Sequence, residues 1–167
     1  MNHPPGPAPG LTPVPCHTRP KPEIVRVEYS LSTKADCGLA WRIFSDCAHW
    51  YRFSDGYRSI EWRGEPWAPG SRLQIEIVNP VAATQDRVIT ICTPPRCVAW
   101  INHVLGYTME QWVLFDPDAC GGTRVSTWIE ITGADFDRCD VEKLITRLIK
   151  EWFVNFCAEC DRMVREV

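Results

Sequence analysis

The sequence predicts one soluble α+β domain over residues 23–167, in which a long C-terminal helix packs on a curved antiparallel sheet of six to seven strands. Apolar residues recur at helical spacing from Asp140 to Val167, which indicates a helix with one wide apolar face. Segments that alternate between apolar and polar residues precede this helix, as expected of strands with one buried face. Short turns join those segments, and short turns favour an antiparallel meander over parallel βαβ units.

The composition limits the class of protein. The chain has 167 residues, of which 45% are hydrophobic, and this suits one domain of ordinary size with a real core. A net charge of −3 is a poor match for nucleic acid, which requires a basic face. The sequence contains no pattern of a secretory signal and no apolar run as long as a membrane span. Nine cysteines, an odd number, then favour free thiols in a reducing, cytoplasmic setting.

Residues 1–22 differ from the rest of the chain because they are rich in proline. They hold eight of the 14 prolines, and proline has a fixed φ and no amide hydrogen to donate. We expect an extended or disordered tail outside the domain. A protein partner that recognises proline-rich segments is one role for this tail, and a plain tail without a partner is the alternative.

The domain is expected to begin with a strand and two short helices. Residues 23–32 alternate, and their apolar face carries Val25, Val27, Tyr29 and Leu31. A helix that continues to about Asp46 follows. Its expected N-cap is Thr33, because Asp36 three residues later completes a pattern that resembles a capping box. Residues 49–53 are expected to form the second short helix.

Six further strands are expected before the long helix. Proline, asparagine and glycine pairs mark several of the turns that separate them, notably Asn79-Pro80, Pro94-Pro95 and Gly121-Gly122. The expected strands are Tyr57–Arg63, Arg72–Val78, Arg87–Cys92, Arg96–Val104, Thr108–Phe115 and Thr123–Thr132. At ~1.5 Å per residue the C-terminal helix is roughly 40 Å long, enough to cross this sheet. The sheet is also the only partner large enough to cover its apolar stripe.

Three local motifs accompany this order of elements. They are Ala40-Trp41-Arg42-Ile43-Phe44-Ser45-Asp46 followed by Trp50 and Phe53, then Gly64 with Gly70-Ser71-Arg72, and Gly121-Gly122-Thr123-Arg124-Val125. Over residues 23–167 the sequence resembles the START and Bet v 1-like (SRPBCC) superfamily, and most closely its polyketide cyclase/dehydrase-like branch. The resemblance implies a helix-grip fold and a cavity between sheet and helix for apolar or amphipathic small molecules. It implies no single reaction, because one fold hosts many functions.

If such a cavity exists, its wall should come from the inner faces of the long helix and the late strands. The expected ligand-binding residues on the helix are Ile145, Leu148, Trp152 and Phe156. Those on the strands are Leu73, Ile75, Trp100, Trp112 and Trp128. The alternative is that all of these side chains close-pack as core and leave no pocket.

Polar strand residues are the candidates for chemistry. Glu76, Arg87, His103 and Glu110 stand out, since a polar group inside an apolar pocket orients a ligand or moves protons. Alternation puts His103 on one face with Ile101, and Glu110 on one face with Trp112. If those faces point inward, His103 or Glu110 could act as acid or base. The alternative places both on the convex, solvated face.

The cysteines and the absent motifs predict no metal and no cofactor. Cys157 and Cys160 form a CxxC pair within the long helix, but a tetrahedral zinc site needs two more ligands. Cys92 and Cys97 are conceivable partners, although their spacing is unlike a zinc ribbon. The sequence has no P-loop, no dinucleotide fingerprint and no nucleophile elbow.

Three functions remain open at this point. The first is non-catalytic binding of a hydrophobic or amphipathic small molecule, such as a lipid, polyketide or isoprenoid. The second is a polyketide cyclase, aromatase or dehydratase-type enzyme that uses acid and base residues in the same cavity. The third is an interaction module whose proline-rich tail recruits a protein partner.

Overall fold

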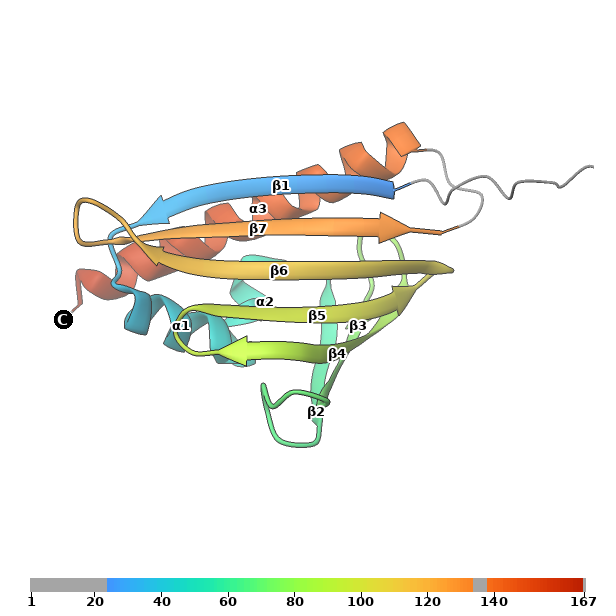
Figure 1. The fold of residues 1–167 in the computed structure, drawn as a ribbon, viewed down its shortest axis with the longest axis horizontal. Coiled ribbons are helices and arrows are strands. Elements are labelled where there is room, and N and C mark those ends of the chain that lie inside the picture. The colour runs from blue at the N-terminus through green and yellow to red at the C-terminus, as the bar shows by residue number, and fades with distance from the viewer. Residues whose placement is uncertain (1–23, 134–137, 167) are drawn as a thin grey trace, which may run out of the picture.

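The computed structural model describes residues 24–133 and 138–166. The proline-rich tail, residues 1–22, lies outside the described residues. Seven antiparallel strands form one curved sheet in the order β1-β7-β6-β5-β4-β3-β2 (Figure 1). The strands are β1 (Ile24–Thr33), β2 (Tyr57–Arg63), β3 (Arg72–Ile77), β4 (Ala83–Thr93), β5 (Cys97–Val104), β6 (Tyr107–Pro117) and β7 (Thr123–Thr132).

Helices cover one face of this sheet. After β1 come α1 (Cys37–Ser45), the single turn η1 (Cys47–His49) and α2 (Trp50–Phe53), and the chain closes with α3 (Arg138–Val164). Figure 1 looks at the opposite, uncovered face, with α3 running behind β1 and β7. The long helix contacts β1, α1 and α2. The predicted fold class, a curved antiparallel sheet that grips a long C-terminal helix, is confirmed.

The N-cap of α1 is Asp36, and the prediction of Thr33 was wrong. The Asp36 carboxylate accepts a hydrogen bond from the Leu39 amide at 2.8 Å. Thr33 instead ends β1, where its hydroxyl donates to Asp161 of α3 at 2.6 Å. The Lys34 amide donates to the same carboxylate oxygen at 2.7 Å. A side chain of α3 therefore uses the hydroxyl that the sequence pattern assigned to a helix cap.

The strand boundaries lie within two residues of the predicted ones except in β4. β2 and β7 begin and end at the predicted residues, whereas β4 begins at Ala83, four residues before the predicted Arg87. These extra residues pair with β3, since Ala83 lies opposite Ile77 and Gln85 lies opposite Ile75. Cross-strand pairing, which local alternation does not report, extends the strand.

A two-residue turn fixes which side chains of β6 share a face with those of β5. Leu105 and Gly106 have φ of 50° and 82°, the pair of positive values typical of a type I′ hairpin turn. The resulting register places Trp100 opposite Gln111. Even-numbered residues of β5 and odd-numbered residues of β6 therefore share one face. That face points toward α3, since Trp100 and Asn102 of β5 and Met109 and Gln111 of β6 line the cavity. A slip of one residue would exchange the two faces.

The core is dense in aromatic rings between α1, α2 and α3. Phe44, Phe53 and Phe156 are fully buried, and each lies within ring-contact distance of Trp152. The Trp152 and Phe156 rings stack with centroids 5.6 Å apart, and Phe53 meets Trp152 edge-on at 4.9 Å. Such contacts add about 0.5–1.5 kcal/mol per pair beyond the area they bury. This cluster fixes α3 against the short helices.

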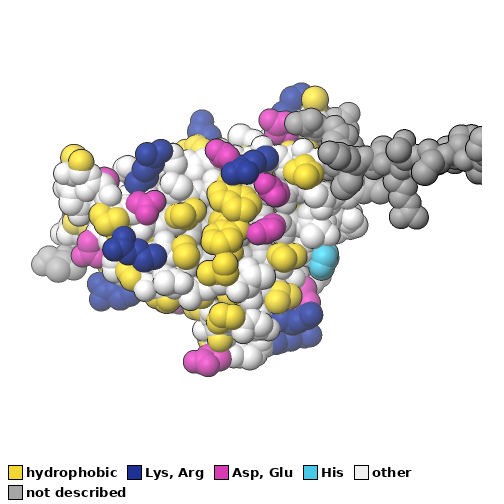
Figure 2. Space-filling model, in the orientation of Figure 1, with side chains coloured by type: hydrophobic (Ala, Val, Ile, Leu, Met, Phe, Trp, Pro, Cys, Tyr) yellow, Lys and Arg dark blue, Asp and Glu magenta, His cyan; other side chains and the backbone are white. Residues whose placement is uncertain are grey.

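The uncovered face of the sheet carries charged and hydrophobic side chains together. Figure 2 shows a hydrophobic band that crosses this face and is flanked by acidic and basic side chains. Within the described residues, no helix combines the length and the apolar character needed to cross a membrane.

Candidate functional site: a cavity between the sheet and the long helix

A cavity of about 150 Å³ lies between the inner face of the sheet, α2 and α3. An apolar cavity of roughly this size holds a molecule as large as benzene. Most of its wall is aromatic or aliphatic, with Trp50, Phe53, Met109 and Ile129 among the lining residues. Asn79, Pro80 and Glu151 also line it and are exposed, so the cavity meets solvent between the β3–β4 connection and α3.

Four of the nine predicted ligand-binding residues line this cavity, and five do not. The four are Trp100 of β5 and Ile145, Leu148 and Trp152 of α3. Leu73 and Ile75 of β3 and Phe156 of α3 lie in the layer between the sheet and the helices, but they are fully buried in the core and do not line the cavity. Trp112 and Trp128 lie on the uncovered face of the sheet, away from the cavity.

The two outer tryptophans stack on each other because the strand register brings them together. Trp112 lies directly opposite Trp128, and their rings stack with centroids 5.6 Å apart. The Trp112 indole nitrogen donates to Glu110 at 2.9 Å, and the Arg26 guanidinium lies 5.0 Å from the centroid of the Trp128 ring. Each indole is half-buried, with its polar partners on the solvated side. From the sequence, Trp112 and Trp128 are expected in the cavity wall only because their rings are large and aromatic.

The two candidate acid–base residues also lie on the uncovered face. His103 is exposed, and its Nδ1 forms a hydrogen bond with the Thr108 hydroxyl at 3.0 Å. Glu110 accepts the indole hydrogen bond from Trp112. Neither residue lines the cavity, because the hairpin register turns both side chains away from α3. Glu76 likewise forms an exposed ion pair, with Arg58 at 2.9 Å.

Of the four polar strand residues that the sequence singled out, Arg87 is the one that lines the cavity. Its guanidinium carbon lies 5.0 Å from the centroid of the Trp100 ring and 5.5 Å from that of the Trp50 ring, over both rings. Its Nε and Nη2 donate to Gln85 Oε1 at 3.0 and 2.8 Å. Because Gln85 precedes it by two residues on β4, alternation brings both side chains to the inner face.

Tyr57 lies beside Arg87 in the cavity wall, and burial shifts the pKa of both groups. Burial raises the pKa of Tyr57, while the nearby Arg87 charge and the Trp152 indole oppose that rise. Burial lowers the pKa of Arg87, and Tyr57 and Cys47 oppose that change. At neutral pH the Tyr57 hydroxyl is therefore protonated and able to donate a hydrogen bond.

Two further cavity residues present polar atoms without a hydrogen-bond partner in the described part of the chain. They are Asn102 Oδ1, in a side chain only 3% exposed, and Trp152 Nε1, whose contact with the Tyr57 hydroxyl is not a well-formed hydrogen bond. A buried polar atom left without a partner costs about 1–3 kcal/mol, so such atoms are rare in proteins. Both atoms therefore suit hydrogen bonds with a bound molecule.

Sequence reasoning missed Tyr57, Gln85 and Asn102 as cavity residues. One signal for Asn102 was present, because Trp100 was expected to face inward and residues two apart on a strand share a face. The same rule places His103 opposite to Trp100. Tyr57 gave no such signal, since its place in the wall depends on a tertiary contact with Trp50 of α2, whose ring centroid lies 6.3 Å from that of Tyr57.

The CxxC thiols lie in the core and carry raised pKa values. Burial raises the pKa of Cys157 to about 12 and raises that of Cys160 further. Protonated, buried thiols are poor nucleophiles and poor metal ligands. Within the described ranges, no set of three or more histidine, cysteine or carboxylate side chains is arranged to hold a metal ion.

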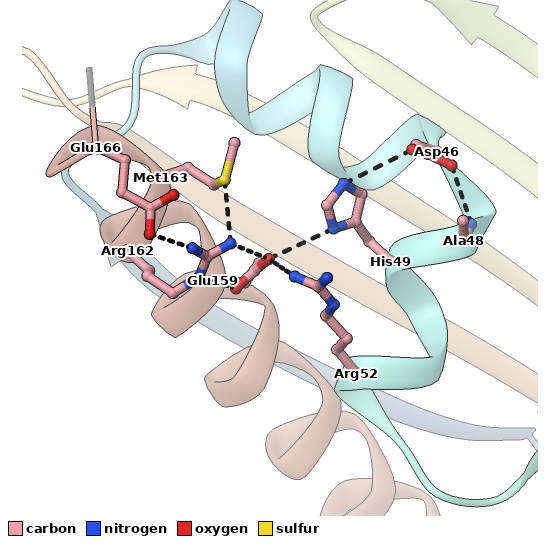
Figure 3. A network of polar contacts seen from close by, with 8 residues as sticks. All are labelled: Asp46, Ala48, His49, Arg52, Glu159, Arg162, Met163 and Glu166. Atoms are coloured by element: carbon pink, nitrogen blue, oxygen red, sulfur yellow. Dashed lines mark hydrogen bonds and ion pairs between the residues drawn. The ribbon is translucent and has the colours of Figure 1, made fainter.

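A separate polar network joins α2 to the end of α3, outside the cavity. Figure 3 shows Glu159 between Arg52, Arg162 and His49. Arg52 Nη1 and Arg162 Nε each lie 2.7 Å from a Glu159 oxygen, and His49 Nδ1 lies 3.5 Å away. Hydrogen bonds from Arg162, joined by those from Arg52, lower the pKa of Glu159 to about 2, although burial acts against them. The network serves to clamp the short helices to α3.

Solved structures with the same fold differ widely from this chain in sequence. A START superfamily protein from Mycobacterium smegmatis superposes with a TM-score of 0.69 at 9% identity, over 83% of this chain and 98% of that one. The ZhuI aromatase/cyclase from a Streptomyces species gives 0.68 at 14% identity, over 85% and 96%. Ara h 8.0201 gives 0.69 at 11% identity, over 83% and 98%. No protein-family model and no curated protein matches the sequence.

Proposed function

We propose, on the basis of the helix-grip fold that this chain shares with START-superfamily and aromatase/cyclase structures, that it binds a hydrophobic or amphipathic small molecule of the lipid, polyketide or isoprenoid class. The observation that carries the proposal is an apolar cavity between sheet and helix whose wall contains polar atoms without partners in the described residues. A preformed apolar pocket with a few convergent polar groups is the usual form of a ligand site.

Binding without chemistry has more support than catalysis. A cyclase or dehydratase needs an acid or base whose pKa is near the working pH, in reach of the substrate. His103 and Glu110, the two acid–base candidates from the sequence, point away from the cavity. Of the ionisable groups in its wall, Tyr57 has a raised pKa, Arg87 remains a cation, and Glu151 is exposed to solvent. None of these three is an obvious general base.

Native mass spectrometry of the purified protein tests the proposal, with a variant that fills the cavity as the comparison. We expect a co-purifying small molecule on the natural chain and its loss from Leu148→Trp, because the larger ring occupies the cavity. Val154 lies on the same helix but is 43% exposed, so Val154→Trp is the matched control and should keep the ligand. The proposal fails if neither a co-purifying molecule nor binding of any added apolar alcohol or acid is detected.

A further inference from the structure

The cavity holds a cation that the protein itself does not neutralise. Moving a charge out of water is unfavourable unless an opposite charge or hydrogen bonds compensate. Tyr57 and Cys47 oppose the lowering of the Arg87 pKa, but both are neutral near pH 7 because their own pKa values are raised. No carboxylate in residues 24–133 or 138–166 forms an ion pair with Arg87. Glu151 lines the cavity from α3, but it is exposed and makes no such pair. An uncompensated arginine in an apolar pocket is ready to pair with an anion.

The contacts of Arg87 hold its guanidinium in place. Gln85 accepts two of the five N–H groups through one oxygen, and the Trp50 and Trp100 rings lie against the guanidinium. Both indoles are almost completely buried, at 2% and 3% exposure. Cation–π contacts of this kind stabilise a cation by about 0.5–2 kcal/mol each. They keep Arg87 charged and its planar fork oriented without occupying it with a carboxylate.

Other hydrogen-bond donors of the wall lie close to this cation. The Tyr57 hydroxyl and the Trp152 indole nitrogen belong to the same part of the cavity as Arg87. The Arg87 charge and the Trp152 indole both lower the pKa of Tyr57, against the effect of burial. Trp152 Nε1 is buried without a well-formed hydrogen bond in the described residues, although its contact with the Tyr57 hydroxyl lowers the pKa of that group. The remaining wall, with Met109, Ile129 and Leu148, is apolar. The cavity therefore has a polar, positively charged end and an apolar remainder.

We propose that the ligand is an amphipathic carboxylic acid whose carboxylate pairs with Arg87 and whose short chain or single ring fills the apolar remainder. This inference rests on the proposed function and specifies the ligand class for the same site. An arginine fork matches a carboxylate with two parallel N–H···O bonds, and such charge-assisted bonds are the stronger kind. Tyr57 and Trp152 supply further donors to an anion. A cavity of about 150 Å³ limits the enclosed part of the ligand to a short chain or one ring.

Isothermal titration calorimetry of the full chain with octanoate, octanol and octylamine at neutral pH tests this inference. The three probes have the same alkyl chain and differ in head-group charge. We expect octanoate to bind about ten- to hundred-fold more tightly than octanol, since a charge-assisted hydrogen bond contributes on that scale. Octylamine should bind most weakly, because Arg87 repels it.

Variants then assign the preference to one side chain. Arg87→Gln should remove most of the octanoate advantage while octanol affinity changes by no more than about two-fold. The control is Arg72→Gln, because Arg72 lies on the neighbouring strand β3 but is exposed and pairs with Asp86. It should leave the affinity of all three probes unchanged. Thermal melts of both variants check that they fold, and the comparison of three probes on the natural chain needs no variant.

The possible outcomes separate the two proposals. Equal affinity for octanoate and octanol, or tighter binding of octylamine, overturns the carboxylate inference and leaves small-molecule binding intact. Octanoate preference that survives Arg87→Gln overturns the assignment to Arg87. If none of the three probes binds the natural chain, both the ligand class and the proposed function fail.

Discussion

Arg87 illustrates how a single residue can be unfavourable for folding and useful for binding. Its burial lowers its pKa, which means that the folded state favours the charged form less than water does. Two indole rings and Gln85 offset part of that cost. Functional sites commonly retain such unfavourable groups because binding requires them. The proposed pairing with an anionic ligand would offset the part of this cost that remains.

Glu159 makes a prediction about acid stability at the scale of one residue. Its pKa falls from 4.5 to about 2 on folding, so its ionised form stabilises the native state at pH above about 4.5. That contribution is lost as the pH falls from about 4.5 through about 2. We expect Glu159→Gln to lower the unfolding temperature at pH 7, and the difference from the natural chain to shrink toward pH 2.

The control for this experiment is Glu61→Gln, since Glu61 is an exposed carboxylate of β2. Thermal unfolding followed by circular dichroism between pH 2 and pH 7 gives both comparisons. The control should unfold within a degree or so of the natural chain at every pH, as surface substitutions usually change stability little. A Glu159→Gln difference that stays constant over this pH range would contradict the prediction.

At the scale of elements, α3 does two jobs with one apolar stripe. Its residues Ile145, Leu148 and Phe153 line the cavity, while Phe156, further along the helix, packs in the aromatic core. Glu159, further still, joins the network with α2. The helix therefore changes from cavity wall to structural anchor along its length. The aromatic cluster around Trp152 lies where these two parts meet.

Truncation of Phe156 measures the structural part of α3. Phe156 is 0% exposed and contacts four aromatic rings besides its helical neighbour Phe153. Phe156→Ala should lower the free energy of unfolding by about 3–5 kcal/mol, because it removes buried area and leaves a void. Chemical denaturation with urea measures this value.

Val154 gives the comparison for Phe156 on the same helix. It is 43% exposed, so Val154→Ala should change the free energy of unfolding by less than about 0.5 kcal/mol. A small loss in Phe156→Ala, equal to that of the control, would show that the ring cluster does not anchor the helix.

At the scale of the whole molecule, the chain divides into a proline-rich tail and a domain, and this division is a prediction about residues 1–22. A chain without those residues should unfold at the same temperature and bind octanol with the same affinity, because the cavity lining lies wholly within residues 44–153. A lower unfolding temperature would mean that the tail is part of the folded unit. If the tail recruits a partner, its removal should also abolish binding to an isolated proline-recognition domain, with ligand affinity unchanged.

The sheet and the long helix both followed from periodicity, since local sequence controls both spacings. Strand alternation placed Leu73, Ile75 and Trp100 on the inner side, and helical spacing placed Ile145 and Leu148 on the covered face of α3. The α1 cap was an exception, because Thr33 found a long-range partner in Asp161. Local pattern fails where a distant residue offers a better hydrogen bond.

The face of β5 and β6 was decided only by tertiary structure. A strand's alternation is symmetric, so the sequence grouped Glu110 with Trp112 and His103 with Ile101 but could not determine which group points inward. The expectation that Trp112 lines the cavity was based on its aromatic ring and not on the alternation. The Leu105-Gly106 turn and the pairing of Trp100 with Gln111 selected Asn102 and Gln111 for the cavity and turned Trp112, Glu110 and His103 outward.

By itself the sequence determined that a long amphipathic helix covers an antiparallel sheet, because apolar spacing is a local property of the chain. Only the tertiary structure brought Tyr57, Gln85, Arg87 and Asn102 to one cavity, since β2, β4 and β5 meet through pairings between strands. The charge at the candidate site results from that convergence. The physical reason is that a binding site depends on relative register and curvature, and no single stretch of residues encodes either.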